Sequence, residues 1–169
     1  MDKEKLIAAC GLYCGACEMY RAVHDKDEAK IDRLVKAFNA AGFKVTREDI
    51  ECDGCLAGGR LTPWCKECTM KNCPEHKNDN GICSPECKDF PCKTLSDFSR
   101  ERWTHHHETV DNLRRLHEMG LTKHAEEEGK RWLCPQCHKS VTWFERACAS
   151  CGALRSEKLF KLDYDWPPK

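Results

Sequence analysis

The chain has 169 residues, of which 40% are hydrophobic and 33% are charged, and its formal net charge is zero. This composition supplies little apolar material for a core, so we expect the fold to need covalent or metal staples. The balanced charge gives no support to a strongly basic nucleic-acid binder, and no apolar run approaches the roughly 18 residues of a membrane helix. No signal-peptide pattern is visible, so we expect a cytoplasmic protein.

Cysteine is the dominant feature, with fifteen residues in the chain. An odd number cannot pair completely in disulfides, and cytoplasmic thiols stay reduced. Many of the cysteines stand in C-x2-C pairs, which in a reducing compartment are typical metal half-sites. We therefore predict a small α+β fold that is stapled by metal. Its expected parts are a cysteine-rich metal-binding module over residues 1–93, a helical linker over 94–131, and a zinc ribbon with an extended tail over 132–169.

The first cysteine motif is "CGLYCGAC", which holds Cys10, Cys14 and Cys17. Zinc and iron–sulfur clusters both accept thiolates, so either can be bound here. The fourth ligand must come from elsewhere in the chain, and Cys87 and Cys92 are the candidates. The same spacing holds a cluster with an open iron in radical enzymes. However, this chain is too short for the barrel that we associate with them, so the spacing does not carry that activity.

Two helices are predicted after this motif. Residues 27–41 are expected to form a helix, because Ile31, Leu34, Val35 and Phe38 recur at helical spacing. Asp25 or Asp27 can cap its start and Gly42 stands at its end. Thr46 followed by Asp49 predicts a second capped helix.

The next cysteines read C-x2-C-x9-C-x2-C and predict a second zinc site, formed by Cys52, Cys55, Cys65 and Cys68. Five single cysteines compete for the same partners: Cys10, Cys73, Cys83, Cys87 and Cys92. Fifteen cysteines and His76 would make sixteen ligands, enough for four tetrahedral sites, and three sites are the alternative. Ser84-Pro85-Glu86 predicts a short turn of helix that carries Cys87.

The linker reads as helix. Val110, Leu113 and Leu116 form an apolar stripe, Gly120 can end the helix, and a shorter helix is expected after it. His105 to His107 cannot all bind one ion on a helix, because successive residues point about 100° apart.

The strongest metal signal is C-x2-C-x10-C-x2-C, formed by Cys134, Cys137, Cys148 and Cys151. The residues between the pairs, "SVTWFERA", suit a short β-hairpin that would bring the two pairs together. Four thiolates at about 2.3 Å from one ion form a closed tetrahedral zinc site. A rubredoxin-like iron is the alternative. We interpret His138 as a bystander beside a ligand.

The order of "CGLYCGAC", "CDGC", "CKEC", "NC" and "GICSPECKDFPC" resembles a cysteine-rich microbial family, domain of unknown function 3795. The resemblance covers about residues 6–95 and all eleven cysteines there. Some members are also similar further on, at Trp132 to Cys137 and at Cys148 to Gly152. The resemblance implies metal binding and assigns no reaction.

Three functions fit these patterns. The first is a non-enzymatic zinc protein that binds a protein partner. The second is an iron–sulfur redox or sulfur-handling protein, which would use the Cys10, Cys14 and Cys17 region for a [4Fe–4S] cluster. The third is a nucleic-acid-binding ribbon, suggested by a basic and aromatic group formed by Lys130, Arg131, Trp132, Lys139, Trp143 and Arg146. No residue stands out as catalytic, and we expect no enzyme.

Overall fold

The structure is a computed structural model that describes residues 3–75 and 80–155. In this part of the chain the fold is mostly helical, and β-pairing is limited to three isolated bridges. The expectation of an α+β fold is therefore correct only for its helices. The α-helices are α1 (Glu18–His24), α2 (Glu28–Ala40), α3 (Arg47–Ile50), α4 (Pro63–Lys66), α5 (Lys93–Phe98), α6 (Thr109–Met119) and α7 (Leu121–Arg131), and the 3-10 helices are η1 (Lys3–Leu6), η2 (Cys14–Ala16) and η3 (Thr104–Glu108).

Helices α1, α2 and α3 enclose a small core of their own. Asp27 begins α2, where its carboxylate accepts the Lys30 N–H at 2.9 Å, so the predicted cap is confirmed. Ile31 of α2 is buried against Ala22 of α1 and Ile50 of α3. The apolar stripe predicted for residues 27–41 is therefore the face of α2 that packs.

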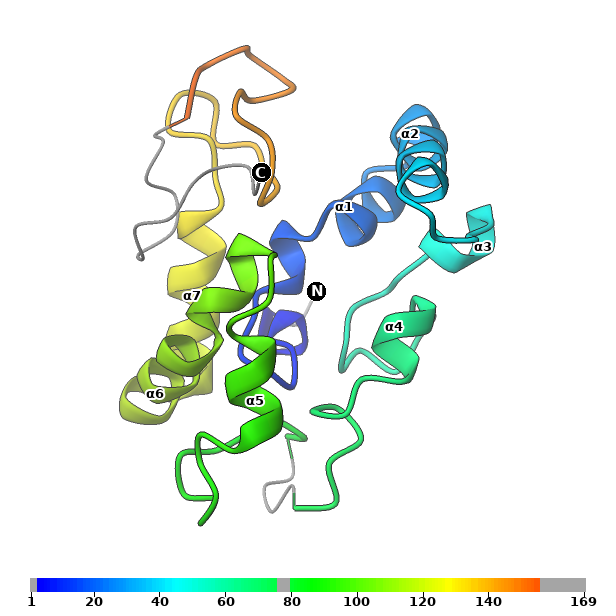
Figure 1. Cartoon of the computed structure of the whole chain (residues 1–169). Helices are drawn as coiled ribbons and strands as arrows, with labels where there is room; N and C mark the ends of the chain where they lie inside the picture. Colours follow the sequence, from blue (N-terminus) through cyan, green and yellow to red (C-terminus); the bar gives the residue numbers. More distant parts are fainter. Residues whose placement is uncertain (1–2, 76–79, 156–169) are drawn as a thin grey trace.

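The main core joins segments that are far apart in sequence. The N-terminal segment, residues 3–16, lies in the middle of the molecule (Figure 1). Helices α5, α6 and α7 lie on one side of it, and α1 to α4 lie on the other. Ile7 from this segment, Leu113 from α6 and Ala125 from α7 are all fully buried in one cluster. Trp132 and Val141 belong to the same cluster. The N-terminal module, the linker and the C-terminal region thus share one hydrophobic core.

A buried ionic network fixes the end of α7. Arg131 donates to both carboxylate oxygens of Glu108, at 2.7 and 2.9 Å, and approaches Glu128 at 3.4 Å. The indole N–H of Trp132 donates to Glu128 at 3.2 Å. Both carboxylate side chains are almost completely buried, at 3% and 2% exposure. Because Cys134 lies two residues after Trp132, this network positions the first cysteine pair of the C-terminal region.

The histidines of η3 pack against aromatic rings. His105 stacks on Trp143 with ring centroids 4.1 Å apart, and His106 stacks on Phe98 at 3.8 Å. Burial lowers the pKa of His106 to about 3, so this ring is neutral at physiological pH. His107 contacts the carbonyl oxygen of Glu101 through Nε2 at 2.6 Å.

Two local expectations are wrong. The segment that begins at Ser84 forms a hydrogen-bonded turn, in which the Cys87 N–H donates to the Ser84 carbonyl at 3.0 Å, and not a helix. The hairpin between the last cysteine pairs is also missing from the described structure. Its backbone donors are used elsewhere, since the Thr142 N–H donates to Glu145 at 2.9 Å and the Trp143 N–H donates to Ala16 at 3.0 Å. No helix in the described ranges is both long and apolar enough to cross a membrane.

Candidate metal centre

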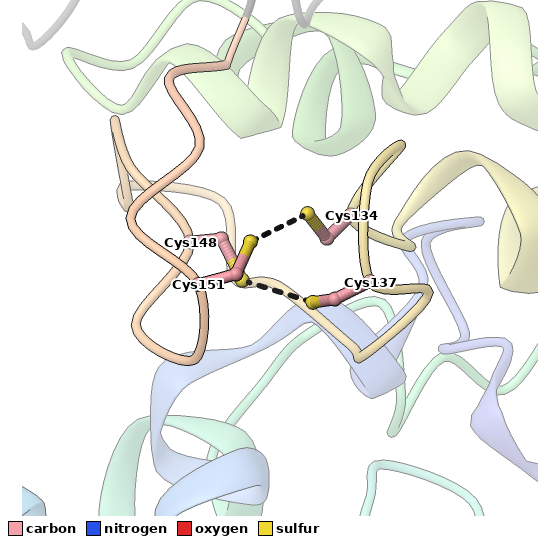
Figure 2. Close-up of side chains that lie close together, drawn as sticks. All are labelled: Cys134, Cys137, Cys148 and Cys151. Atoms are coloured by element: carbon pink, nitrogen blue, oxygen red, sulfur yellow. Dashed lines mark hydrogen bonds between the residues drawn. The ribbon is translucent and has the colours of Figure 1, made fainter.

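The four C-terminal cysteines bring their sulfur atoms to one point. The Sγ atoms of Cys134 and Cys151 are 3.6 Å apart, as are those of Cys137 and Cys148 (Figure 2). All four sulfurs lie within 4.8 Å of one another. A Zn–S distance of about 2.3 Å in a tetrahedron gives an S–S edge of about 3.8 Å. The arrangement is therefore that of a set of four thiolates around a single ion.

The two cysteine pairs stand on turns of the same design. In each turn the first cysteine donates its N–H to the residue five positions on, Cys134 to Lys139 at 2.8 Å and Cys148 to Ala153 at 2.9 Å. The residue four positions on has positive φ, 56° at His138 and 72° at Gly152. Each turn also closes with one isolated bridge. His138 therefore has a conformational role in the turn that its sequence position does not reveal.

Backbone N–H groups in these turns favour the thiolate form of two ligands. The N–H groups of Cys137 and Gln136 lower the pKa of the Cys134 thiol to about 6. The N–H groups of Ser150 and Cys151 lower the pKa of Cys148 in the same way. Because a metal binds thiolate and not thiol, the turns prepare these sulfurs for a cation.

The C-terminal group lies against the first cysteine motif. The Trp143 N–H donates to the carbonyl of Ala16, which lies between Cys14 and Cys17 in sequence. Lys30 of α2 pairs with Glu145 at 2.7 Å across the same contact. The loop between the two C-terminal pairs therefore covers the turn that carries the N-terminal thiols.

The motif "CGLYCGAC" folds as a close-packed turn. The Ala8 N–H donates to Leu12 at 2.8 Å, and Gly11, with φ of 81°, occupies the bend. A Cβ atom at Gly11 would lie 2.9 Å from Cγ of Leu113. A Cβ atom at Gly15 would lie 2.5 Å from the ring of Tyr13. The two glycines of the motif therefore permit close approach, a role that sequence reasoning about the cysteines missed.

The cysteines of the predicted second zinc site separate into different contacts. A hydrogen bond between the Cys52 and Cys65 side chains lowers the pKa of Cys52 to about 6 and raises that of Cys65. The Cys55 N–H instead donates to the Cys14 sulfur at 3.5 Å. The Cys55 thiol also lies near Cys68 and Cys52, and Cys14 lies near both Cys52 and Cys55, so the predicted second site adjoins the first motif.

Of the other thiols in the first motif, Cys10 is buried and Cys17 is half-buried. Burial raises the pKa of Cys17 to about 12, with a further contribution from nearby Cys52. Burial also raises the pKa of Cys10, and the thiols of Cys55, Cys68 and Cys83 are close enough to add to the shift. Within residues 3–75 and 80–155, only the C-terminal group brings three or more candidate ligand atoms within 4.8 Å of one another.

A second place where cysteines converge is a cavity. Cys73, Cys83, Cys87 and Cys92 all line one cavity of about 270 Å³. Cys87 and Cys92, considered above as partners of the first motif, thus lie with Cys73 and Cys83. His76, the histidine proposed as a ligand, lies outside the described residues. All fifteen cysteines are within the described part of the chain, and none of them forms a disulfide.

The basic and aromatic group near the C-terminal cysteines is only partly exposed. Trp132 and Trp143 are 3% and 8% exposed, and both belong to the core. Arg131 is engaged by Glu108, whereas Lys139 and Arg146 are exposed. The two indole rings are therefore not available to stack on bases.

One comparison with known proteins identifies a family for this chain. The family described as protein of unknown function (DUF3795) matches residues 6–97. This range begins before the first cysteine motif and ends in α5, so it includes the cavity cysteines and excludes the C-terminal group. Searches of curated proteins and of solved structures give no match. The chain belongs to the DUF3795 family, and beyond the matched residues it carries a C-terminal group of four cysteines suited to holding a metal ion.

Proposed function

We propose that this protein binds metal through cysteine, and that its C-terminal four-cysteine group holds one structural Zn²⁺ ion. The observation that carries the proposal is the pair of 3.6 Å sulfur distances within a group that spans no more than 4.8 Å. Four protein thiolates would fill a tetrahedral site and leave no open position for substrate. A structural role for this ion, and not a catalytic one, follows from the donor set.

The ion would hold the two C-terminal turns in place against the cysteine-rich N-terminal residues. The two turns make few backbone contacts of their own, since each closes with one bridge. Their attachment to the module includes the bond from Trp143 to Ala16 and the pair between Lys30 and Glu145. An ion that joins both turns would hold these contacts together at the first cysteine motif. Metal binding would then contribute directly to the free energy of folding.

The test compares three variants of the full chain that is purified without a metal-binding tag. Cys137→Ser and Cys148→Ser should each contain one zinc fewer per chain than the wild type. Ser150→Ala, in the same turn but with a side chain that is not a ligand, should retain the zinc. Hydrogen exchange at the Trp143 amide should accelerate in the two cysteine variants only. Unchanged zinc content in both cysteine variants would contradict the proposal.

A further inference from the structure

The cavity near α5 collects a second set of four thiols. Cys73 lines the cavity together with the C-x3-C-x4-C series Cys83, Cys87 and Cys92. All four side chains are partly buried, so none is a freely solvated surface thiol. Four cysteines around one cavity can serve as metal ligands. They could hold either a single ion or a larger metal cluster.

The spacing of the sulfurs does not suit a single ion. Around one tetrahedral zinc, every pair of sulfurs would be about 3.8 Å apart. The C-terminal group meets that requirement, but in the described ranges no three thiols of the cavity lie within 4.8 Å of one another. In an iron–sulfur cluster of the cubane type each thiolate binds a different iron, so the sulfurs are separated by the cluster core. A cluster core accommodates thiols that are too far apart to bind one ion together.

The volume of the cavity leads to the same conclusion. By the same measure of volume, about 10–15 Å³ is enough for one water molecule, so a space of about 270 Å³ is far larger than one ion between four sulfurs would leave. Ile82 and Leu95 are buried at 3% and 1% exposure, and with Phe90 they provide an apolar wall. A compact inorganic core held by thiolates can fill such a space without requiring further polar partners.

The backbone around the four thiols is well held. The Cys83 N–H donates to Ala9 at 2.8 Å, and the Cys87 N–H donates to Ser84 at 3.0 Å. The Cys92 carbonyl accepts the Ser96 N–H at 2.9 Å as α5 begins. These bonds fix three of the four cysteines before any metal binds, and the bond to Ala9 ties the cavity to the first cysteine motif.

We propose that Cys73, Cys83, Cys87 and Cys92 bind one [4Fe–4S] cluster in this cavity. With four cysteine ligands, each iron is coordinated by the protein and none is open to a substrate. The site shares no cysteine with the C-terminal group, so its occupancy does not depend on the structural zinc proposed above.

The test is anaerobic reconstitution of the full chain with ferrous iron and sulfide, followed by measurement of iron, acid-labile sulfide and visible absorption. Relative to the wild type, Cys87→Ser and Cys92→Ser should each lose about four irons and four sulfides per chain. Glu86→Gln alters an exposed residue that lines the same cavity and should retain them. Cys148→Ser should keep its iron while losing only zinc, which separates this proposal from the preceding one.

A second measurement locates the cluster without any substitution. In the reconstituted wild type, the four cavity cysteines should resist alkylation, and they should become labelled after an iron-specific chelator such as bipyridyl removes the metal. Mass spectrometry of the peptides identifies which thiols change. The proposal is wrong if the wild type takes up no iron and sulfide, if the Cys87 and Cys92 variants keep the wild-type iron, or if these thiols react equally before and after chelation.

Discussion

Replacing Gly11 with alanine tests how closely the first cysteine motif packs on α6. Gly11 has a φ of 81°, a conformation that an L side chain disfavours. Its new methyl group would lie 2.9 Å from Cγ and 3.1 Å from Cδ2 of Leu113, and 3.3 Å from the Leu113 backbone nitrogen. Leu113 is fully buried, so its side chain has little room to move away.

The expected loss has two parts that a control can separate. The left-handed backbone costs alanine about 1–2 kcal/mol, and overpacking a core typically costs about 1–3 kcal/mol. We therefore expect Gly11→Ala to lower the free energy of unfolding by about 2–5 kcal/mol, the sum of those ranges. Gly42 has a φ of 91°, but no atom lies within 4 Å of the place that a methyl group would take there. Gly42→Ala should show only the backbone part.

The assay is denaturant unfolding of the metal-loaded chain, followed by tryptophan fluorescence and by circular dichroism, with metal content checked for each variant. Leu113→Ala alone should cost about 2–5 kcal/mol, because it leaves a cavity. The double variant Gly11→Ala, Leu113→Ala should lose less than the sum of the single losses, because the clashing carbons are gone. Equal losses for Gly11→Ala and Gly42→Ala, or strict additivity in the double variant, would refute the contact.

Three further predictions concern the rest of the fold. Arg131→Met should cost about 3–5 kcal/mol, because it removes the cation that pairs with the buried Glu108 carboxylate. Arg33→Met, which removes an exposed pair with Asp27, should cost at most about 1 kcal/mol. Similar losses for the two variants in denaturant unfolding would contradict this. His138→Gly should raise the stability of the zinc-loaded chain by up to about 1 kcal/mol, because glycine adopts the φ of 56° found at His138 without strain. A lower thermal midpoint for this variant would disprove the reasoning. Complete removal of metal by a chelator should abolish most of the helical circular dichroism, and an unchanged spectrum would show that the fold does not need metal.

Features that depend on short stretches of chain could be predicted from the sequence. The cap at Asp27 and the apolar stripe that includes Ile31 are local, and α2 begins and packs as they indicate. The C-terminal group is local as well, because its cysteines lie within 18 residues and each pair stands on its own turn. Their spacing alone restricts how far apart the four sulfurs can be.

The β-hairpin expected between the C-terminal cysteine pairs does not form, because a distant part of the chain takes one of its backbone donors. The alternation of Val141, Thr142 and Trp143 fits a strand, but the Trp143 N–H pairs with Ala16, which is more than a hundred residues away. A backbone donor can serve one partner well, and the distant carbonyl competes with any local ladder. No pattern within the segment could reveal that partner.

The order and spacing of residues were enough to establish that this protein is rich in cysteine, belongs with a family defined by those cysteines, and has a C-terminal group suited to one metal ion. Which distant thiols meet is visible only in the folded chain, because C-x2-C spacing fixes the two sulfurs of a pair and not the direction from which others arrive. The fold brings Cys55 to Cys14 of the first motif, places Cys87 and Cys92 around the cavity with Cys73 and Cys83, and packs the C-terminal loop on the first motif. These neighbours depend on segments far apart in sequence sharing one core, which is a property of the whole chain.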